Sequence, residues 1–211
     1  MSQLPSGVER RSIDGREWLA TKGAPIGDEP AADGWRAWRP DRSKLAAMIE
    51  SELPIALSPD DRVLYLGAAA GTTVSYLADV VDMVYAVEFA PRPMQSLIDV
   101  AETRPNVIPL LKDARQPETY AHVVESDLDL IVQDVATRNP AAVAVANRPF
   151  LAEDGALYCA IKARSMDVTA DPTEMFDAAR TELESAYTVN ATTRLDPLHI
   201  DHLGIVASPV S

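Results

Sequence analysis

The chain has 211 residues, of which 47% are hydrophobic, enough for one globular domain with a small appendage. No apolar run approaches the ~20 residues that a membrane helix needs, and the N-terminus lacks a secretory pattern, so we expect a cytoplasmic protein without a membrane partner. The single cysteine, Cys159, excludes an internal disulfide and a cysteine-based zinc site, and we expect no metal centre.

The charge is strongly acidic, with 32 acidic against 19 basic residues and a net charge of −13. Only four of the basic residues are lysines, namely Lys22, Lys44, Lys112 and Lys162. An acidic, lysine-poor surface suits very high salt, which screens self-repulsion, so we predict a halophilic source. In such a chain the net charge does not exclude nucleic acid, and a retained lysine is a candidate for chemistry that arginine cannot supply.

Residues 1–55 are interrupted by prolines and glycines and predict a small β-rich domain followed by a linker helix. Strand patterns cover Gly7–Ile13 and Glu17–Thr21. The helix is expected to begin after Ser43, a residue type that caps helix N-termini, and to run to about Leu53.

Residues 56–211 alternate between apolar strand patterns and helical patterns. The predicted strands are Val63–Gly67, Met83–Phe89, Val107–Leu111, Leu128–Asp134, Ala156–Lys162, Tyr187–Arg194 and Gly204–Ala207. The predicted helices are Thr73–Val81, Pro93–Thr103, Pro117–Glu125, Pro140–Phe150 and Thr173–Ser185. This alternation is typical of an α/β fold, here a Rossmann-like, mostly parallel sheet of seven strands with an antiparallel pair at one edge.

The glycine-rich turn after the first of these strands indicates a ligand site. Gly67 and Gly71 enclose three alanines, and Thr72 and Thr73 then begin a helix, so a ligand can lie against the backbone. Three acids stand at the ends of the next three strands and are expected to meet at the same edge of the sheet: Glu88, Asp113 and Asp134. Glu88 lies 21 residues after Gly67, the spacing at which an acid binds ribose hydroxyls.

The same turn also favours one class of nucleoside. It lacks the middle glycine of the dinucleotide motif G-x-G-x-x-G and the lysine of a P-loop, which argues against a pyrophosphate and against an oxidoreductase. An adenosine ligand without phosphates fits better, and S-adenosylmethionine is the cofactor that we predict.

Lys162 ends the fifth predicted strand and is the candidate base for a hydroxyl acceptor. A lysine with the ordinary pKa of ~10.4 is protonated at neutral pH, so it needs a cationic neighbour or burial to act as a base. The sulfonium of S-adenosylmethionine is such a neighbour, and Lys44 is a second. Asp134 opposes the effect but is expected to aim the amine. His202, at the start of the last strand, is expected to reach the site from the sheet edge, whereas His199 and His122 are interpreted as structural.

These residues occur in segments that resemble the fibrillarin family of archaea, over nearly the whole chain. The segments are Trp38–Ala47, Val63–Thr73, Val84–Arg92, Asp113–Arg115, Val132–Ala136, Ile161–Lys162 and Asp201–His202. The resemblance implies a catalytic tetrad of Lys44, Asp134, Lys162 and His202. It also implies cofactor contacts from Thr72, Thr73, Glu88, Phe89, Asp113, Ala114, Asp134, Val135, Ala136 and Thr137, where Thr137 stands in place of the glutamine usual in the family.

The resemblance further implies an activity and partners. Fibrillarins transfer a methyl group from S-adenosylmethionine to ribose 2′-hydroxyls of rRNA or tRNA in a box C/D particle. A Nop5-type scaffold protein, an L7Ae-type protein and a guide RNA complete the particle. Arg36, Arg39 and Arg42 form a basic cluster near Lys44 that we interpret as steering the RNA, with pairing to surface acids as the alternative.

Two other functions remain open from the residues. A stand-alone methyltransferase would act on a protein or small molecule without guide RNA or scaffold. An architectural particle subunit would tolerate changes in the tetrad.

Overall fold

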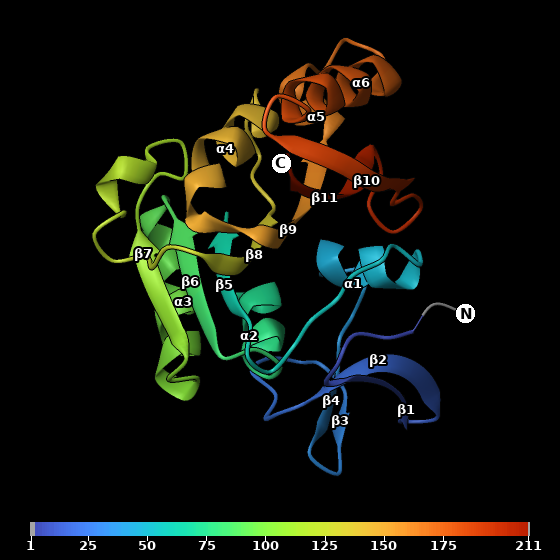
Figure 1. Ribbon diagram of the computed structural model, residues 1–211. Coiled ribbons are helices and arrows are strands. Elements are labelled where there is room, and N and C mark those ends of the chain that lie inside the picture. The colour runs from blue at the N-terminus through green and yellow to red at the C-terminus, as the bar shows by residue number, and fades with distance from the viewer. Residues whose placement is uncertain (1–2, 211) are drawn as a thin grey trace.

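The computed structural model describes residues 3–210 and contains two sheets. The first two residues of the predicted N-terminal domain (1–55) and the last of the predicted methyltransferase domain (56–211) lie outside this range. In Figure 1 the small sheet (blue) lies below the large one, and the helix α1, Lys44–Glu50, lies between them.

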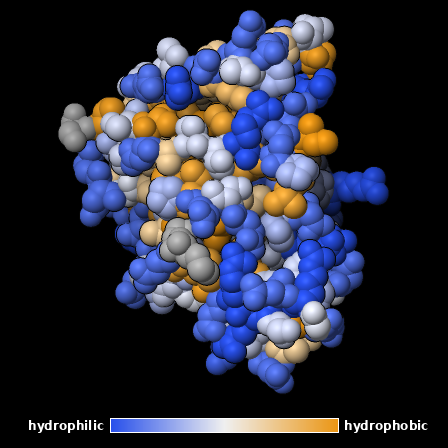
Figure 2. Space-filling model, turned by 90° about the vertical axis from the view of Figure 1, so that its right-hand side faces the viewer, coloured by the Kyte–Doolittle hydropathy of each residue, from blue (hydrophilic) through white to orange (hydrophobic). Residues whose placement is uncertain are grey.

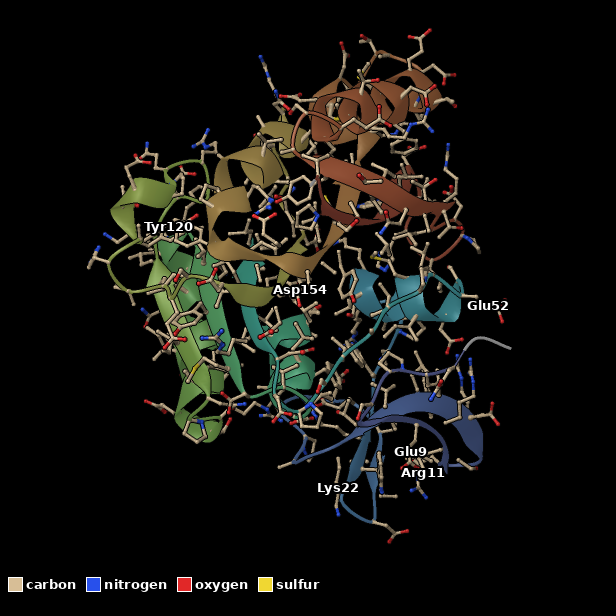
Figure 3. The ribbon with its side chains drawn as sticks, in the orientation of Figure 1. Glu9, Arg11, Lys22, Glu52, Tyr120 and Asp154 are labelled. Carbon is tan, nitrogen blue, oxygen red and sulfur yellow. The ribbon has the colours of Figure 1, made fainter. Side chains whose placement is uncertain are left out.

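The small sheet is antiparallel and has the strand order β1-β2-β4-β3. Its strands are β1 (Val8–Ile13), β2 (Arg16–Lys22), β3 (Ala31–Ala32) and β4 (Trp35–Ala37). Both hairpins turn through an Asp-Gly pair with positive φ angles, which matches the twist of paired strands. Charged side chains such as Glu9 and Arg11, which form an ion pair, and Lys22 lie on its outer surface (Figure 3).

The large sheet has seven strands in the order β10-β11-β9-β8-β5-β6-β7. They are β5 (Arg62–Leu66), β6 (Met83–Glu88), β7 (Val107–Leu111), β8 (Leu128–Gln133), β9 (Leu151–Lys162), β10 (Tyr187–Arg194) and β11 (His202–Pro209). β5 to β9 pair in parallel, and β11 is antiparallel to both β9 and β10. The predicted seven-stranded α/β fold with an antiparallel pair at one edge is confirmed.

Helices cover both faces of this sheet (Figure 1). They are α2 (Thr72–Ala78), α3 (Pro91–Thr103), α4 (Pro140–Asn147), α5 (Ala163–Met166) and α6 (Pro172–Leu183), with 3-10 turns at Pro117–Thr119 and Arg148–Phe150. Successive residues of one strand point to opposite faces of the sheet and pack in different hydrophobic clusters. In β5, Val63 and Tyr65 pack with α1 to α3, whereas Leu64 and Leu66 pack with α4 and α6. Burial on both faces explains why the strands read as continuous apolar runs.

One predicted helix is wrong. The segment predicted as Pro117–Glu125 forms only the short 3-10 turn and then further turns. Its Tyr120 (Figure 3) is fully buried, with its hydroxyl donating to Asn147 Oδ1, so the chain is fixed by a tertiary contact. A helix of nine residues has little stability of its own, and this anchor decides the local structure. Ser43, in contrast, caps α1 as predicted, with its Oγ accepting from the Ala46 N–H.

Candidate active site

The turn after β5 brings three chain segments into contact. Gly67 has a φ of 83°, and a Cβ there would lie 2.4 Å from the carbonyl oxygen of Asp134. Its N–H donates to the carbonyl of Val87, at the end of β6. A glycine is therefore needed here for backbone conformation and for close approach. The turn places the carboxyl ends of β5, β6 and β8 around one space.

That space is a cavity of about 280 Å³ at the carboxyl ends of β5 to β8. The predicted residues that line it are Gly67, Glu88, Phe89, Asp113, Ala114, Asp134, Val135, Ala136 and Thr137. Five further lining residues were not predicted as site residues: Ala69, Val87, Lys112, Arg115 and Val143. Val87, Lys112 and Arg115 each adjoin a predicted site residue in the sequence, and Ala69 lies within the glycine turn between Gly67 and Gly71. Val143, from α4, has no sequence signal because only the fold brings it to the cavity.

Three predicted cofactor residues do not line this cavity. Gly71 caps α2 with a φ of 83°. Thr72 lines a separate cleft between α3 and the N-terminal domain. Thr73 is buried, and its hydroxyl donates to Ser43 Oγ at 3.0 Å. The side chain of Thr73 thus joins α2 to the cap of α1.

The acids of the cavity are held in different ways. Glu88 is 7% exposed, and its two oxygens accept from the N–H groups of Ala69 at 2.9 Å and Ala90 at 2.7 Å. Each oxygen keeps a lone pair for a further donor. Asp113 accepts from the guanidinium of Arg115, which lowers the pKa of that carboxyl and keeps it charged.

The residues present fit an adenosine group. Glu88 offers acceptor oxygens for ribose hydroxyls, and the Asp113 carboxylate can accept from an amino group. Phe89 is 69% exposed at the cavity wall, where its ring offers a flat apolar face to a base.

Beside this cavity the structure brings together three of the four predicted catalytic residues. Lys44 Nζ, at the start of α1, lies 2.8 Å from Asp134 Oδ2, after β8. Both side chains are about one quarter exposed. Both charges also shift the pKa of the His202 ring, at the start of β11: Lys44 lowers it and Asp134 raises it.

Lys162 is placed next to this group by strand pairing. It ends β9 directly opposite His202 in the β9–β11 register. Its side chain is exposed and has no ion pair with any residue in the range 3–210. The expectation that Asp134 aims Lys162 therefore differs from the geometry, in which Asp134 is paired with Lys44.

Burial lowers the pKa of His202, which favours the neutral ring at neutral pH. The hydrogen bond to the Ile200 carbonyl opposes burial in part, the charge of Lys44 lowers the pKa further, and Asp134 raises it. The ring nitrogen Nδ1 lies 2.8 Å from the Ile200 carbonyl oxygen. A carbonyl can only accept, so Nδ1 bears the proton and Nε2 has the free lone pair.

The predicted RNA-steering cluster does not form. Arg36 is fully buried and pairs with Glu29 and Asp79. Arg39 pairs with Asp41, and Arg42 pairs with Asp28. The structure instead has the alternative, in which each of these arginines pairs with a nearby acid.

Cys159 is fully buried beneath the site and accepts from the amide of Gln133, and burial raises the pKa of its thiol to about 12. Among residues 3–210 no cluster of three metal-ligand side chains occurs. In the same range no helix combines the length and apolarity needed to cross a bilayer.

Comparison with known proteins places this geometry in a family. A family model described as fibrillarin matches residues 16–210. A fibrillarin-like rRNA/tRNA 2′-O-methyltransferase of Halorubrum lacusprofundi is 59% identical over 206 residues, covering 98% of this chain and 97% of the relative. Relatives from halophilic archaea agree with the acidic, lysine-poor composition.

Two solved structures extend the comparison. The fibrillarin of a fibrillarin/Nop5p complex superposes with a TM-score of 0.90 at 42% identity, covering 99% of this chain and all of that one. The fibrillarin of Aeropyrum pernix, solved with natively bound S-adenosyl-L-methionine, has a TM-score of 0.87 at 38% identity, with 97% and 95% of the chains covered. The chain belongs to the fibrillarin family.

Proposed function

We propose that this protein transfers a methyl group from S-adenosylmethionine to ribose 2′-hydroxyls of rRNA and tRNA. Relatives named as rRNA/tRNA 2′-O-methyltransferases span nearly the whole chain, and one fibrillarin structure has the cofactor bound. The observation that supports the proposal most directly is the Lys44–Asp134 pair with His202 beside it, at the rim of a cavity that fits adenosine.

The cofactor, when bound, supplies the methyl group and a positive sulfonium. Glu88 and Asp113 would hold the adenosine, and Phe89 would cover the base. Asp134 lines the cavity and binds Lys44, so it ties the adenosine site to the residues that meet the RNA.

Lys162 is the base that we propose for the 2′-hydroxyl. It stands exposed at the end of β9, where an acceptor can reach it. The positive charge of Lys44 favours the anionic oxygen that forms on the acceptor. Neutral His202 adds no competing charge and offers Nε2 as an acceptor for orienting the hydroxyl or an ammonium group. Most of the catalysis is then alignment and electrostatics.

We further propose that the chain works as the catalytic subunit of a box C/D particle. A related fibrillarin is known in a complex with Nop5p. The arginines near Lys44 are paired with acids, so this surface offers few unpaired cations to a phosphate backbone. Base pairing by a guide RNA, on a Nop5-type scaffold with an L7Ae-type protein, would supply the affinity and the choice of nucleotide.

The test is methyl transfer from labelled S-adenosylmethionine to a guide-matched RNA in high salt. The complete set of scaffold, L7Ae-type protein and guide should give label on the ribose, and omission of any one should remove it. Transfer by the lone protein to a protein or small molecule would refute the guided reaction and favour a stand-alone methyltransferase. Lys162→Ala should abolish turnover while cofactor binding stays within about twofold, and substantial activity in that variant would refute the proposed base.

A further inference from the structure

The loop between β10 and β11 is closed by its own hydrogen bonds. Leu195 N–H donates to the His202 carbonyl at 3.0 Å, and His199 N–H donates to the Leu195 carbonyl at 2.9 Å. The Asp201 N–H donates to Asp196 Oδ1 at 3.2 Å. These bonds make the loop a compact unit, so the position of His202 depends on what holds the loop. One anchor is His199, whose Nε2 lies 2.8 Å from the Pro40 carbonyl oxygen.

Asp201 holds it to the segment that follows Lys162. Its carboxylate accepts from Arg164 Nε at 2.5 Å, and its carbonyl accepts from the Ala163 N–H at 3.0 Å. The β9–β11 ladder has Lys162 opposite His202 as its last pair, and the Asp201 contacts extend it one step further. Asp201 thus fixes the end of β9, which bears the proposed base Lys162, relative to the start of β11, which bears the imidazole of His202.

The local energetics indicate that this arrangement is held under constraint. Asp201 has a φ of 57°, a left-handed backbone conformation that is unfavourable for residues with a Cβ. Its side chain is only 11% exposed, whereas that of Arg164 is 60% exposed. A carboxylate that is mostly buried needs charged partners, because an unpaired one would draw water into the site. Arg164 is the near partner, and Arg194 lies 4.0 Å from the other oxygen.

We propose that Asp201, clamped by Arg164, is a positioning residue that keeps His202 in register with Lys162. This inference rests on the proposed methyl transfer. It gives Asp201 and Arg164 a role in that reaction that the proposed function does not assign to them. Neither residue contacts the cavity, so their action on the reaction passes through His202 and Lys162.

The readout is the titration of His202, which does not require RNA or partners. The ring is faced by Lys44 from α1, by Asp134 after β8 and by His199 from its own loop, with Lys162 opposite on β9. Burial is the largest effect on its pKa and lowers it. The chain has three histidines, so NMR signals of the rings can be assigned with His122→Gln and His199→Gln.

In Asp201→Ala we expect the loop to loosen, the ring to gain water, and the pKa of His202 to rise toward the ordinary ~6.5. Arg164→Ala should have the same effect, and Arg164→Lys, which keeps the charge, a smaller one. Loss of the carboxylate charge without movement would instead lower that pKa, because an anion stabilises imidazolium. The matched control is Glu125→Gln, which breaks an arginine–carboxylate pair at the start of β5, at the opposite end of the sheet.

In Asp201→Ala the rate of methyl transfer in the assembled particle should fall on the order of tenfold to hundredfold, because a small displacement of catalytic side chains has an effect of that size. Cofactor affinity should stay within about twofold. An unchanged or lowered His202 pKa in Asp201→Ala, or an unchanged rate, would overturn the positioning role. If the pKa rises but the wild-type particle transfers no methyl group to ribose, the clamp stands and the proposed function fails.

Discussion

Lys44 Nζ and Asp134 Oδ2 lie 2.8 Å apart, although they come from the first helix and from the loop after β8. This ion pair joins the cofactor cavity to the candidate catalytic group. Asp134 is therefore paired with Lys44 and not with Lys162, which is exposed and has no acidic partner among residues 3–210.

We expect Lys44→Ala and Asp134→Asn to be strongly non-additive. Each should lower single-turnover methyl transfer by about 10²- to 10⁴-fold, and the double variant should be little worse than either, because the residues act as one unit. Single-turnover rates in a double-mutant cycle test this. Additive losses would show that the pair is not a functional unit.

Gly67→Ala should damage the cofactor cavity. The new Cβ would meet the Asp134 carbonyl at 2.4 Å, so the Asp134 loop must shift, and cofactor affinity and methyl transfer should both fall. Gly34→Ala is the matched control, since Gly34 has a similar positive φ of 79° but no atom within 4 Å of the added Cβ. Titration calorimetry with S-adenosylmethionine should separate the two variants, and equal affinities would contradict the close-approach argument.

Asp79→Ala should destabilise the junction between the two sheets. Asp79 is 6% exposed and binds Arg36, Arg104 and the Thr21 hydroxyl. Its removal leaves two buried guanidinium groups short of a partner, so we expect a loss of about 3–5 kcal/mol in unfolding free energy.

Denaturant titration at fixed high salt measures this loss. Glu153→Gln, which breaks a pair at a side chain 80% exposed, should change the free energy by less than about 0.5 kcal/mol. A similarly small change in Asp79→Ala would contradict a structural role for the buried network at the domain junction.

The depressed pKa of His202 predicts a pH dependence of stability. In the folded protein the ring binds a proton less readily than in the unfolded chain, so the unfolded state gains protons first as the pH falls. The stabilisation is therefore present above the unfolded pKa of ~6.5 and is lost as the pH falls from there through the lower folded pKa. Unfolding free energies measured from pH 8 to 5 should fall less steeply in His202→Gln than in wild type, and parallel curves would refute the assignment.

Local sequence patterns predicted most of the fold because both faces of the sheet are covered. Each strand from β5 to β8 is mainly apolar, as is the predicted part of β9, Ala156–Lys162, and each is followed by a helix or turn; β9 begins five residues earlier than predicted, in the polar segment 151–155. The predicted helix at Pro117–Glu125 failed because the burial of Tyr120 beside Asn147 is a tertiary contact that no local pattern records.

The sequence by itself determined the glycine turn, the three acids at strand ends and the rare lysines at positions 44 and 162, because these depend on residue type and spacing. Only the tertiary structure decided the partners. The packing of α1 against the sheet paired Lys44 with Asp134, and acids nearby in space neutralised Arg36, Arg39 and Arg42. The Lys44–Asp134 and Arg36–Asp79 pairs and the cavity walls join residues far apart in the chain, so their geometry follows from packing.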